Sequence, residues 1–227
     1  MASKRVKQAR AKAKGRHREL LEIERALWLH DLSVGGVDEV GAGPLAGPVV
    51  AACVVLNPNA VSGLVGVDDS KVLTEDSRES WAEVIRETAL AVCVAEASVD
   101  EIDSLNIRRA SMLAMERAVE GAAERMGSAI GQLLVDARIL PNYPGRQLEI
   151  IRGDSRSLSI AAASVVAKVD RDQQMMEAAE RFPGYGFEQH KGYSTAAHLE
   201  ALRELGPCPL HRTSFAPVRS AASLSLW

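Results

Sequence analysis

One stretch, residues 35–48, limits what this chain can fold into more than any other part of the sequence. It reads GGVDEVGAGPLAGP, so that two adjacent carboxylates, Asp38 and Glu39, lie among glycines and prolines, and an apolar run over residues 49–56 follows. A carboxylate at the edge of a buried strand is costly unless a cation meets it. Glycine allows another backbone to approach closely, and proline restricts the turns. The stretch therefore predicts a rigid carboxylate platform beside a loop with open main-chain N–H groups.

The composition is that of an ordinary globular protein, because 47% of the 227 residues are apolar and 25% are charged. This length suits one large domain, or one domain with a small appendage. The cysteines Cys53, Cys93 and Cys208 form no CxxC pair, which argues against a zinc site or a disulfide framework. No apolar run reaches membrane-spanning length, and the basic start is not followed by the apolar region of a signal peptide. We therefore expect a cytoplasmic monomer with no membrane partner.

The charge of the chain is distributed unevenly. Residues 1–20 contain eight Lys and Arg but only one acidic residue, Glu19, which leaves 19 basic and 29 acidic residues in the remainder. An acidic body is unusual for a nucleic-acid-binding protein, but a basic arm can supply the phosphate contacts instead. Two alternatives stay open, a solvated terminus and an organelle transit peptide.

The hydrophobic periodicity predicts an α/β fold, a mixed β-sheet flanked by helices. The expected strands cover residues 33–38, 49–56, 89–98, 132–136 and 148–154. The expected helices cover residues 16–29, 75–88 (capped by Thr74), 107–126, 160–181 and 195–205 (capped by Ser194), and the tail from residue 206 reads as a loop. We divide the chain into a basic arm and helix (1–32), a catalytic domain (33–181) and a C-terminal helical segment packed on the same domain (182–227).

Three of these strands end in a carboxylate, at Asp38 with Glu39, at Asp136 and at Asp154. Functional groups collect at strand ends in open α/β sheets. Four carboxylates in one place would repel one another, and two divalent cations would remove that penalty. Hard oxygen ligands select Mg²⁺ or Mn²⁺, and two such ions about 4 Å apart suit the attack of water on a phosphodiester.

Each carboxylate alone also has a structural interpretation. An aspartate at a strand end is often a turn former or a helix cap, and Asp154, just before Ser155, is well placed to cap the following helix. The glycine-rich loop lacks both the Gly-Lys-Ser/Thr of a P-loop and a complete GxGxxG, so a nucleotide-binding fold is disfavoured. A nest of backbone N–H groups remains possible there.

Two lysines and a tyrosine in the C-terminal half are candidate substrate contacts. Residues 190–194 combine Lys191, which can pair with phosphate, with Tyr193, which can stack on a sugar or a base, although a plain surface loop would have the same composition. Lys168 lies in a helix expected to be buried, where it either snorkels or reaches the acidic cluster or a phosphate. We interpret His198 and His211 as isolated surface or capping residues.

Taken in order, the motifs resemble those of bacterial ribonuclease HII, the type 2 ribonuclease H. The similarity is carried by residues 38–49, by DSK at 69–71, LVD at 134–136 and GDS at 153–155, and by residues 160–172, 185–198 and 212–215. It implies a ribonuclease H-like fold. It also implies an endonuclease that cleaves the RNA of RNA–DNA hybrids and cleaves duplex DNA at a lone ribonucleotide, leaving 3′-hydroxyl and 5′-phosphate ends.

The resemblance also implies roles for individual residues. Asp38, Glu39, Asp136 and Asp154 match the carboxylates that bind the two Mn²⁺ or Mg²⁺ ions. The loop of Gly41, Ala42 and Gly43 matches the element that reads the ribose 2′-hydroxyl, and Tyr193 matches the tyrosine at the RNA–DNA junction.

Two positions depart from the family pattern. Ala42 stands where the family has Arg or Lys, and Ala137 stands where it has Gly. Loss of the cation at Ala42 leaves one rival function open, a hybrid-binding protein that cleaves weakly. A second rival, which does not depend on Ala42, is a DNA-directed nuclease with the same metal chemistry.

Overall fold

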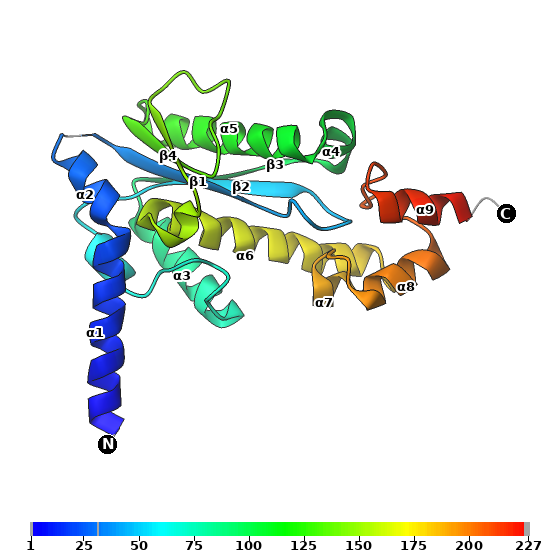
Figure 1. Ribbon diagram of the computed structural model, residues 1–227, viewed down its shortest axis with the longest axis horizontal. Helices are drawn as coiled ribbons and strands as arrows, with labels where there is room; N and C mark the ends of the chain where they lie inside the picture. The colour runs from blue at the N-terminus through cyan, green and yellow to red at the C-terminus, as the bar shows by residue number, and fades with distance from the viewer. Residues whose placement is uncertain (1, 31, 225–227) are drawn as a thin grey trace.

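The computed structural model describes residues 2–30 and 32–224, with side chains over residues 7–30 and 32–223. The predictions for residues 1, 31 and 225–227 lie outside the described residues. A five-stranded sheet forms the centre of the fold (Figure 1), with the order β3-β2-β1-β4-β5. The strands are β1 (Val34–Val40), β2 (Val49–Val55), β3 (Ala91–Ala97), β4 (Gln132–Asp136) and β5 (Gln147–Ile150). Because β1 pairs antiparallel with β2 and parallel with β4, the predicted mixed sheet is confirmed.

Two long helices cover the two faces of the sheet. Figure 1 shows α5 (Ile107–Met126) on one side and α6 (Leu158–Arg181) on the other, with α3 (Glu75–Thr88) beyond α6. The first half of α6 is apolar nearly all round and is buried, as expected. Thr74 caps α3 through the backbone N–H of Ser77, which confirms the predicted cap.

The structure corrects the predicted ends of two strands. Asp38 lies inside β1, because pairing with β2 continues to Val40 opposite Val50. Strand β5 ends at Ile150, and the chain then turns into a short 3₁₀ helix, η2 (Gly153–Ser155), which contains Asp154. The four carboxylates therefore do not all come from strand ends.

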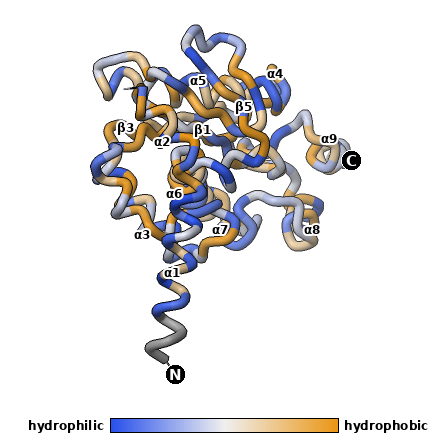
Figure 2. The backbone as a smooth tube through the Cα atoms, turned by 60° about the vertical axis from the view of Figure 1, so that its left-hand side comes forward, coloured by the Kyte–Doolittle hydropathy of each residue, from blue (hydrophilic) through white to orange (hydrophobic). Residues whose placement is uncertain are grey.

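The N-terminal region forms two helices in place of the single helix expected over residues 16–29. Helix α1 (Ala2–Leu20) extends away from the body, and α2 (Glu22–Trp28) follows it directly and lies next to the sheet (Figures 1 and 2). Leu20 and Leu21, at the junction, are fully buried in the core. Glu24 is also buried and accepts hydrogen bonds from the hydroxyls of Ser157 and Ser159, which attaches α2 to the start of α6.

The C-terminal segment contains more helix than expected. It holds α7 (Phe187–His190), α8 (Ala196–Leu205) and α9 (Ala216–Leu224), so the prediction of a loop after residue 206 is wrong for α9. Val218 on α9 is buried against Leu45 and Leu202, a contact that no local pattern indicates. The cap of α8 is Thr195 and not Ser194, because the Thr195 hydroxyl accepts the N–H of His198.

Besides η2, α7 and α9, two further elements had no counterpart in the prediction, the helix α4 (Val99–Leu105) and the 3₁₀ helix η1 (Val61–Leu64). Over the part of the chain that the structure describes, no helix is long and apolar enough to cross a membrane.

Candidate active site

Strands β1 and β4 bring the first carboxylates together. Val37 pairs with Val135 in the parallel register, so the next residues, Asp38 and Asp136, are neighbours on adjacent strands. Asp38 is only 5% exposed, and the side chain of Glu39 is 10% exposed. A carboxylate pair is therefore held in a largely desolvated position by the centre of the sheet.

The 3₁₀ helix η2 adds the fourth carboxylate. The N–H of Gly153 donates to Asp136 Oδ1 at 2.6 Å, which ties η2 to the end of β4. A β-carbon at Gly153 would lie 2.5 Å from Ile160 Cδ1 and 3.2 Å from Asp136 Oδ1, so any other residue here would displace these side chains. The side chain that caps α6 belongs to Ser157, and the interpretation of Asp154 as its cap is wrong.

The electrostatics of the cluster favour added positive charge. Burial raises the pKa of Asp38 well above its ordinary value, and the nearby charges of Glu39 and Asp136 raise it further, against a hydrogen bond from Ser164. Burial likewise raises the pKa of Glu39 and of Asp136. The structure thus holds carboxylates whose ionised forms lack full compensation from the protein.

Two cationic side chains compensate part of this charge. Lys71 Nζ lies 2.6 Å from Asp154 Oδ2, and Arg138 Nη2 lies 2.9 Å from Glu39 Oε1. Lys71 comes from the DSK motif, but the sequence pattern gave it no separate role. Its side chain is 74% exposed, so it can leave Asp154 at low cost.

The donor atoms suit a hard divalent cation, because every candidate ligand is a carboxylate oxygen. In the described part of the chain, however, no three Asp, Glu, His or Cys side chains already form a group that could hold a metal ion. The pairs Lys71–Asp154 and Arg138–Glu39 occupy carboxylate oxygens that a metal would need. A metal ion bound at the two oxygens that these pairs engage, Asp154 Oδ2 and Glu39 Oε1, would displace Lys71 and Arg138.

The glycine-rich loop lies next to Tyr193. Gly41 and Gly47 have positive φ angles of 92° and 85°, and the side chain of Ala42 is exposed. A β-carbon on Gly43 would lie 3.9 Å from Tyr193 Cε1, so the tyrosine ring lies beside the loop. The ring of Tyr193 is 43% exposed and is accessible to a ligand.

The two candidate lysines make contacts of their own. Lys191 Nζ donates to the carbonyl of Glu188 at 2.5 Å. Lys168 Nζ pairs with Asp172 Oδ1 at 2.6 Å, one turn further along α6, and not with the four carboxylates. Substrate contacts by Lys168 and Lys191 stay predictions.

The sequence interpretation of two histidines is wrong. His198 and His211 are 0% and 1% exposed, and their Nε2 atoms lie 3.0 Å apart. Two arginines, Arg171 and Arg212, were given no role, yet both are fully buried beneath the glycine-rich loop. Both belong to the matched motif blocks, but no local pattern indicates their partners.

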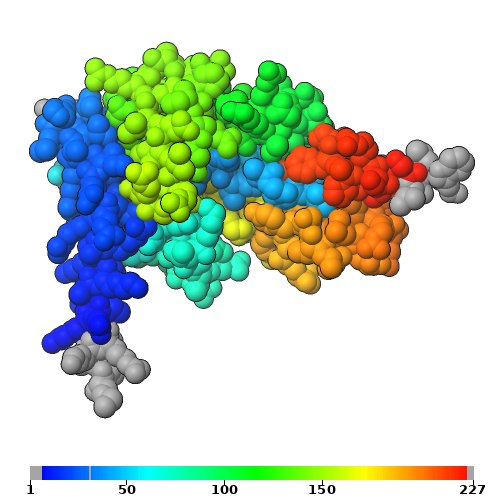
Figure 3. All heavy atoms as spheres, in the orientation of Figure 1, coloured from blue at the N-terminus to red at the C-terminus, as the bar shows by residue number. Residues whose placement is uncertain are grey.

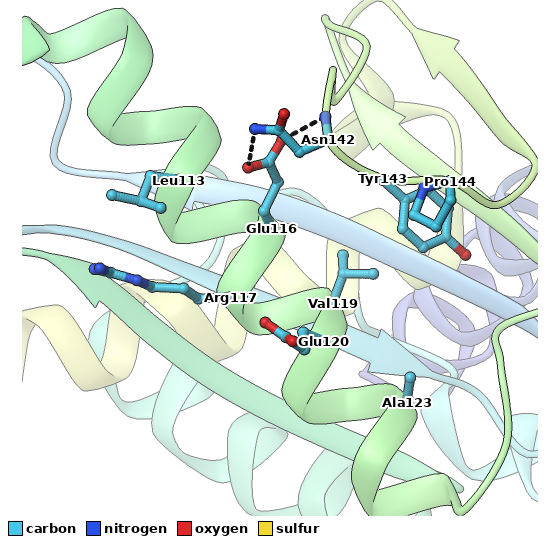
Figure 4. Close-up of a pocket in the computed structure, with 9 residues that line it drawn as sticks. All are labelled: Leu113, Glu116, Arg117, Val119, Glu120, Ala123, Asn142, Tyr143 and Pro144. Atoms are coloured by element: carbon cyan, nitrogen blue, oxygen red, sulfur yellow. Dashed lines mark hydrogen bonds between the residues drawn. The ribbon is translucent and has the colours of Figure 1, made fainter.

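A separate hollow of about 490 Å³ lies on the α5 side of the sheet (Figure 4). It is lined by Leu113, Glu116, Arg117, Val119, Glu120, Ala123, Asn142, Tyr143 and Pro144. Glu116 accepts both the backbone and the side-chain N–H of Asn142, each at 3.0 Å. None of the four carboxylates lines this hollow, so it is not the candidate active site.

Comparison with known proteins agrees with the fold and the motifs. The ribonuclease HII family model matches residues 35–218. A ribonuclease HII of Hyphomonas neptunium is 51% identical over 196 residues, which is 82% of this chain and 94% of that protein. The crystal structure of the ribonuclease H2 from Pyrococcus horikoshii is similar with a TM-score of 0.68 at 26% identity, covering 85% of this chain and 98% of that chain. The structure of Bst-RNase HIII in complex with Mn²⁺ shares the fold with a TM-score of 0.68 at 20% identity, covering 86% of this chain and 70% of that chain.

The sheet order and these neighbours define a protein with the ribonuclease H-like fold, as expected. The chain belongs to the ribonuclease HII family. It is accordingly a ribonuclease H, an endonuclease that degrades the RNA strand of RNA–DNA hybrids.

Proposed function

We propose that this ribonuclease H also incises duplex DNA on the 5′ side of a single embedded ribonucleotide, leaving 3′-hydroxyl and 5′-phosphate ends. The observation that carries the proposal is that the exposed ring of Tyr193 lies beside the loop of Gly41–Gly43. Only RNA carries a 2′-hydroxyl, so a loop that reads it selects the ribonucleotide. An aromatic ring beside the loop can then test the sugar of the next nucleotide by stacking.

We propose Asp38, Glu39, Asp136 and Asp154 as the residues that would hold two divalent ions. The raised pKa of Asp38, caused first by burial and then by Glu39 and Asp136, supports a need for added positive charge. Such ions, when bound, activate water and stabilise the leaving oxygen. When the ions bind, Lys71 would release Asp154 and Arg138 would release Glu39. The all-oxygen donor set supports Mg²⁺ or Mn²⁺, and the related fold of Bst-RNase HIII is known in complex with Mn²⁺.

The remaining assignments are also proposals. All four carboxylates come from β1, β4 and η2 of one chain, so the candidate site needs no residue from a second copy, which supports a monomer. Three free thiols, Cys53, Cys93 and Cys208, support a reducing compartment such as the cytoplasm.

The test uses duplex DNA with one ribonucleotide, an all-DNA duplex of the same sequence, and Mg²⁺ or Mn²⁺. We expect incision 5′ of the ribonucleotide only, and we expect Asp136→Asn to abolish it while Asp100→Asn, on the exposed side of α4, leaves it unchanged. Absence of incision with either metal would contradict the proposal. Equal cutting of the all-DNA duplex would identify a DNA-directed nuclease instead.

A further inference from the structure

Two arginines are buried beneath the glycine-rich loop without a carboxylate partner. Arg171, on α6, and Arg212, before α9, are both 0% exposed, and neither forms an ion pair with any residue that the structure describes. Burial lowers the pKa of both, and that of Arg212 to about 9. Burying a guanidinium costs free energy, so the hydrogen bonds that each arginine donates to backbone carbonyls must offset that cost.

Arg171 is the only described side chain that bonds to both substrate-reading loops. Its Nε donates to the carbonyl of Pro48 at 3.2 Å, and its Nη2 donates to the carbonyl of Ala46 at 3.2 Å. Its Nη1 donates to the carbonyl of Lys191 at 3.1 Å, two residues before Tyr193. One planar guanidinium therefore joins the loop of residues 41–48 to the loop that carries Tyr193.

The surroundings leave this guanidinium little freedom. A β-carbon at Gly41 would lie 2.2 Å from Arg171 Nε, and one at Gly192 would lie 2.6 Å from the carbonyl oxygen of Ala46. The N–H of Leu45 also donates to the carbonyl of Gly192 at 2.8 Å. The two loops are thus pressed together, with the guanidinium filling the space below them.

Arg212 makes a different set of contacts and provides an internal comparison. Its guanidinium donates to the carbonyls of Gly41, Ala42, Gly47 and Pro48, at 2.6 to 3.2 Å. All four belong to the glycine-rich loop and none to residues 190–194. Arg212 therefore shapes one loop, whereas Arg171 relates that loop to the other.

We infer that Arg171 is a positioning residue that sets the distance between the ribose-reading loop and Tyr193, and so sets the preference for a single ribonucleotide over a continuous hybrid. This inference rests on the proposed function. A single ribonucleotide places a 2′-hydroxyl next to a deoxyribose, so both loops must be correctly spaced to read it. Inside a continuous RNA strand there is no such junction, and the spacing matters less. Lysine keeps the charge but cannot donate three hydrogen bonds in a fixed plane.

The experiment measures kcat/KM of Arg171→Lys on duplex DNA with one ribonucleotide and on a uniform RNA–DNA hybrid. We expect the ratio of kcat/KM on the single ribonucleotide to kcat/KM on the uniform hybrid to fall at least tenfold. Arg171→Gln, which replaces the guanidinium with a planar amide that has two N–H donors, is measured alongside in case the lysine variant unfolds. Arg212→Lys is the buried control, expected to lower both activities and keep the ratio, and the exposed Arg203→Lys should change neither.

A double-mutant cycle separates positioning from general damage. In a Tyr193→Ala background, Arg171→Lys should change the ratio by less than twofold, because the residue through which it acts is gone. An equal loss on both substrates, or the same fall in the ratio with and without Tyr193, would overturn the inference. If the wild-type protein does not incise a single ribonucleotide at all, the proposed function fails instead, which is a distinguishable outcome.

Discussion

At the scale of single residues, Ala137 has a backbone conformation that suits glycine. Its φ is +51°, in the left-handed region, and it directly follows Asp136 at the site. This explains why related sequences carry glycine at the position, as the resemblance indicates. The left-handed conformation costs a residue with a β-carbon about 1 kcal/mol.

We therefore expect Ala137→Gly to stabilise the protein by about 0.5–1 kcal/mol, since relief of strain exceeds the added freedom of the unfolded chain. Urea denaturation would measure it. Ala129→Gly is the matched control, because Ala129 lies in a connection without a positive φ, and it should be neutral or destabilising. A loss of stability in Ala137→Gly would contradict the assignment of strain.

Ala42 offers a second prediction at this scale. Its methyl group is exposed, and its carbonyl is held by Arg212, so a longer side chain would extend into solvent without disturbing the loop. We expect Ala42→Arg to strengthen hybrid binding by about 1 kcal/mol, close to fivefold in Kd, by adding a phosphate contact. Binding in metal-free buffer would test this, with Ala42→Gln as the uncharged control. Equal affinities of the Arg and Gln variants would exclude a charge effect.

At the scale of elements, the start of α6 packs directly on β1. A β-carbon at Gly36 would lie 2.2 Å from the backbone carbon of Ser159 and 2.4 Å from the nitrogen of Ile160. This contact sets the position of α6 against the strand that carries Asp38 and Glu39. It also places η2, which precedes α6, at the site.

We expect Gly36→Ala to destabilise the protein by about 3 kcal/mol or more, because the clash is with backbone atoms that cannot move alone. Gly63→Ala is the control, since nothing lies within 4 Å of a β-carbon there, and it should cost less than about 1 kcal/mol. Thermal unfolding would compare the two. Similar melting temperatures would show that α6 moves away from β1 without cost.

The paired histidines join α8 to the segment before α9. The N–H of Cys208 donates to His211 Nδ1, and His198 Nδ1 contacts the carbonyl of Tyr193, so one hydrogen bond runs from His211 Nε2–H to His198 Nε2. A further proton on His198 goes to Nε2 and removes that bond, and one on His211 goes to Nδ1 and removes the bond from Cys208. Burial first, and then the charge of His198, lowers the pKa of His211 from 6.5 to about 4.

Stability should therefore depend on pH in acid. Between pH 6.5 and about 4 the unfolded histidine binds a proton that folded His211 does not, so the free energy of unfolding falls as the pH falls through this window. A pKa difference of one corresponds to about 1.4 kcal/mol. Denaturation at several pH values would measure the slope, which His211→Gln should reduce and the exposed His30→Gln should keep. An unchanged slope in His211→Gln would exclude this pair as its source.

At the scale of the whole molecule, the N-terminal part of α1 projects from the body, whereas its C-terminal end, with His17 and Leu20, is buried (Figure 3). Arg16 anchors its base through two hydrogen bonds to Asp68, at 2.8 and 2.9 Å, and one to the carbonyl of Ser155, next to Asp154. Lys7, Arg10, Lys12 and Lys14 are exposed along the helix. Exposed basic side chains thus extend outward from a point beside the candidate active site, and phosphate binding by this helix stays a prediction.

We expect deletion of residues 1–14, which stops short of Arg16, to flatten the salt dependence of hybrid binding without lowering the melting temperature. For duplex DNA, the slope of log K against log salt should become shallower by about 0.9 for every phosphate that α1 no longer neutralises. A full-length variant with glutamine at Lys4, Arg5, Lys7, Arg10, Lys12 and Lys14 removes the same six cations without shortening the chain, and it should behave like the deletion. An unchanged slope would mean that α1 does not touch the nucleic acid.

The elements of the core follow from local sequence, and their predicted positions were close to those observed. Helix 107–126 and strand 132–136 were predicted to the residue, because each has a clear periodicity or apolar run and a distinct boundary. The C-terminal helix α9 was missed, since its apolar face is defined only by Leu45 and Leu202 from elsewhere in the chain. Which carboxylates belong together also came from sequence, through ordered motifs of a recognisable family.

Tertiary structure alone decided how these carboxylates and loops are held. Arg212 and Gly41 are 171 positions apart, and Arg171 and Lys191 meet only because α6 passes beneath both loops. The sequence by itself determined the chemical groups of the site, since residue types and local periodicity are written in it. It did not determine their partners, the bend that delivers Asp154 or the buried histidine pair, because each depends on contacts between distant segments that form only when the sheet and α6 are assembled.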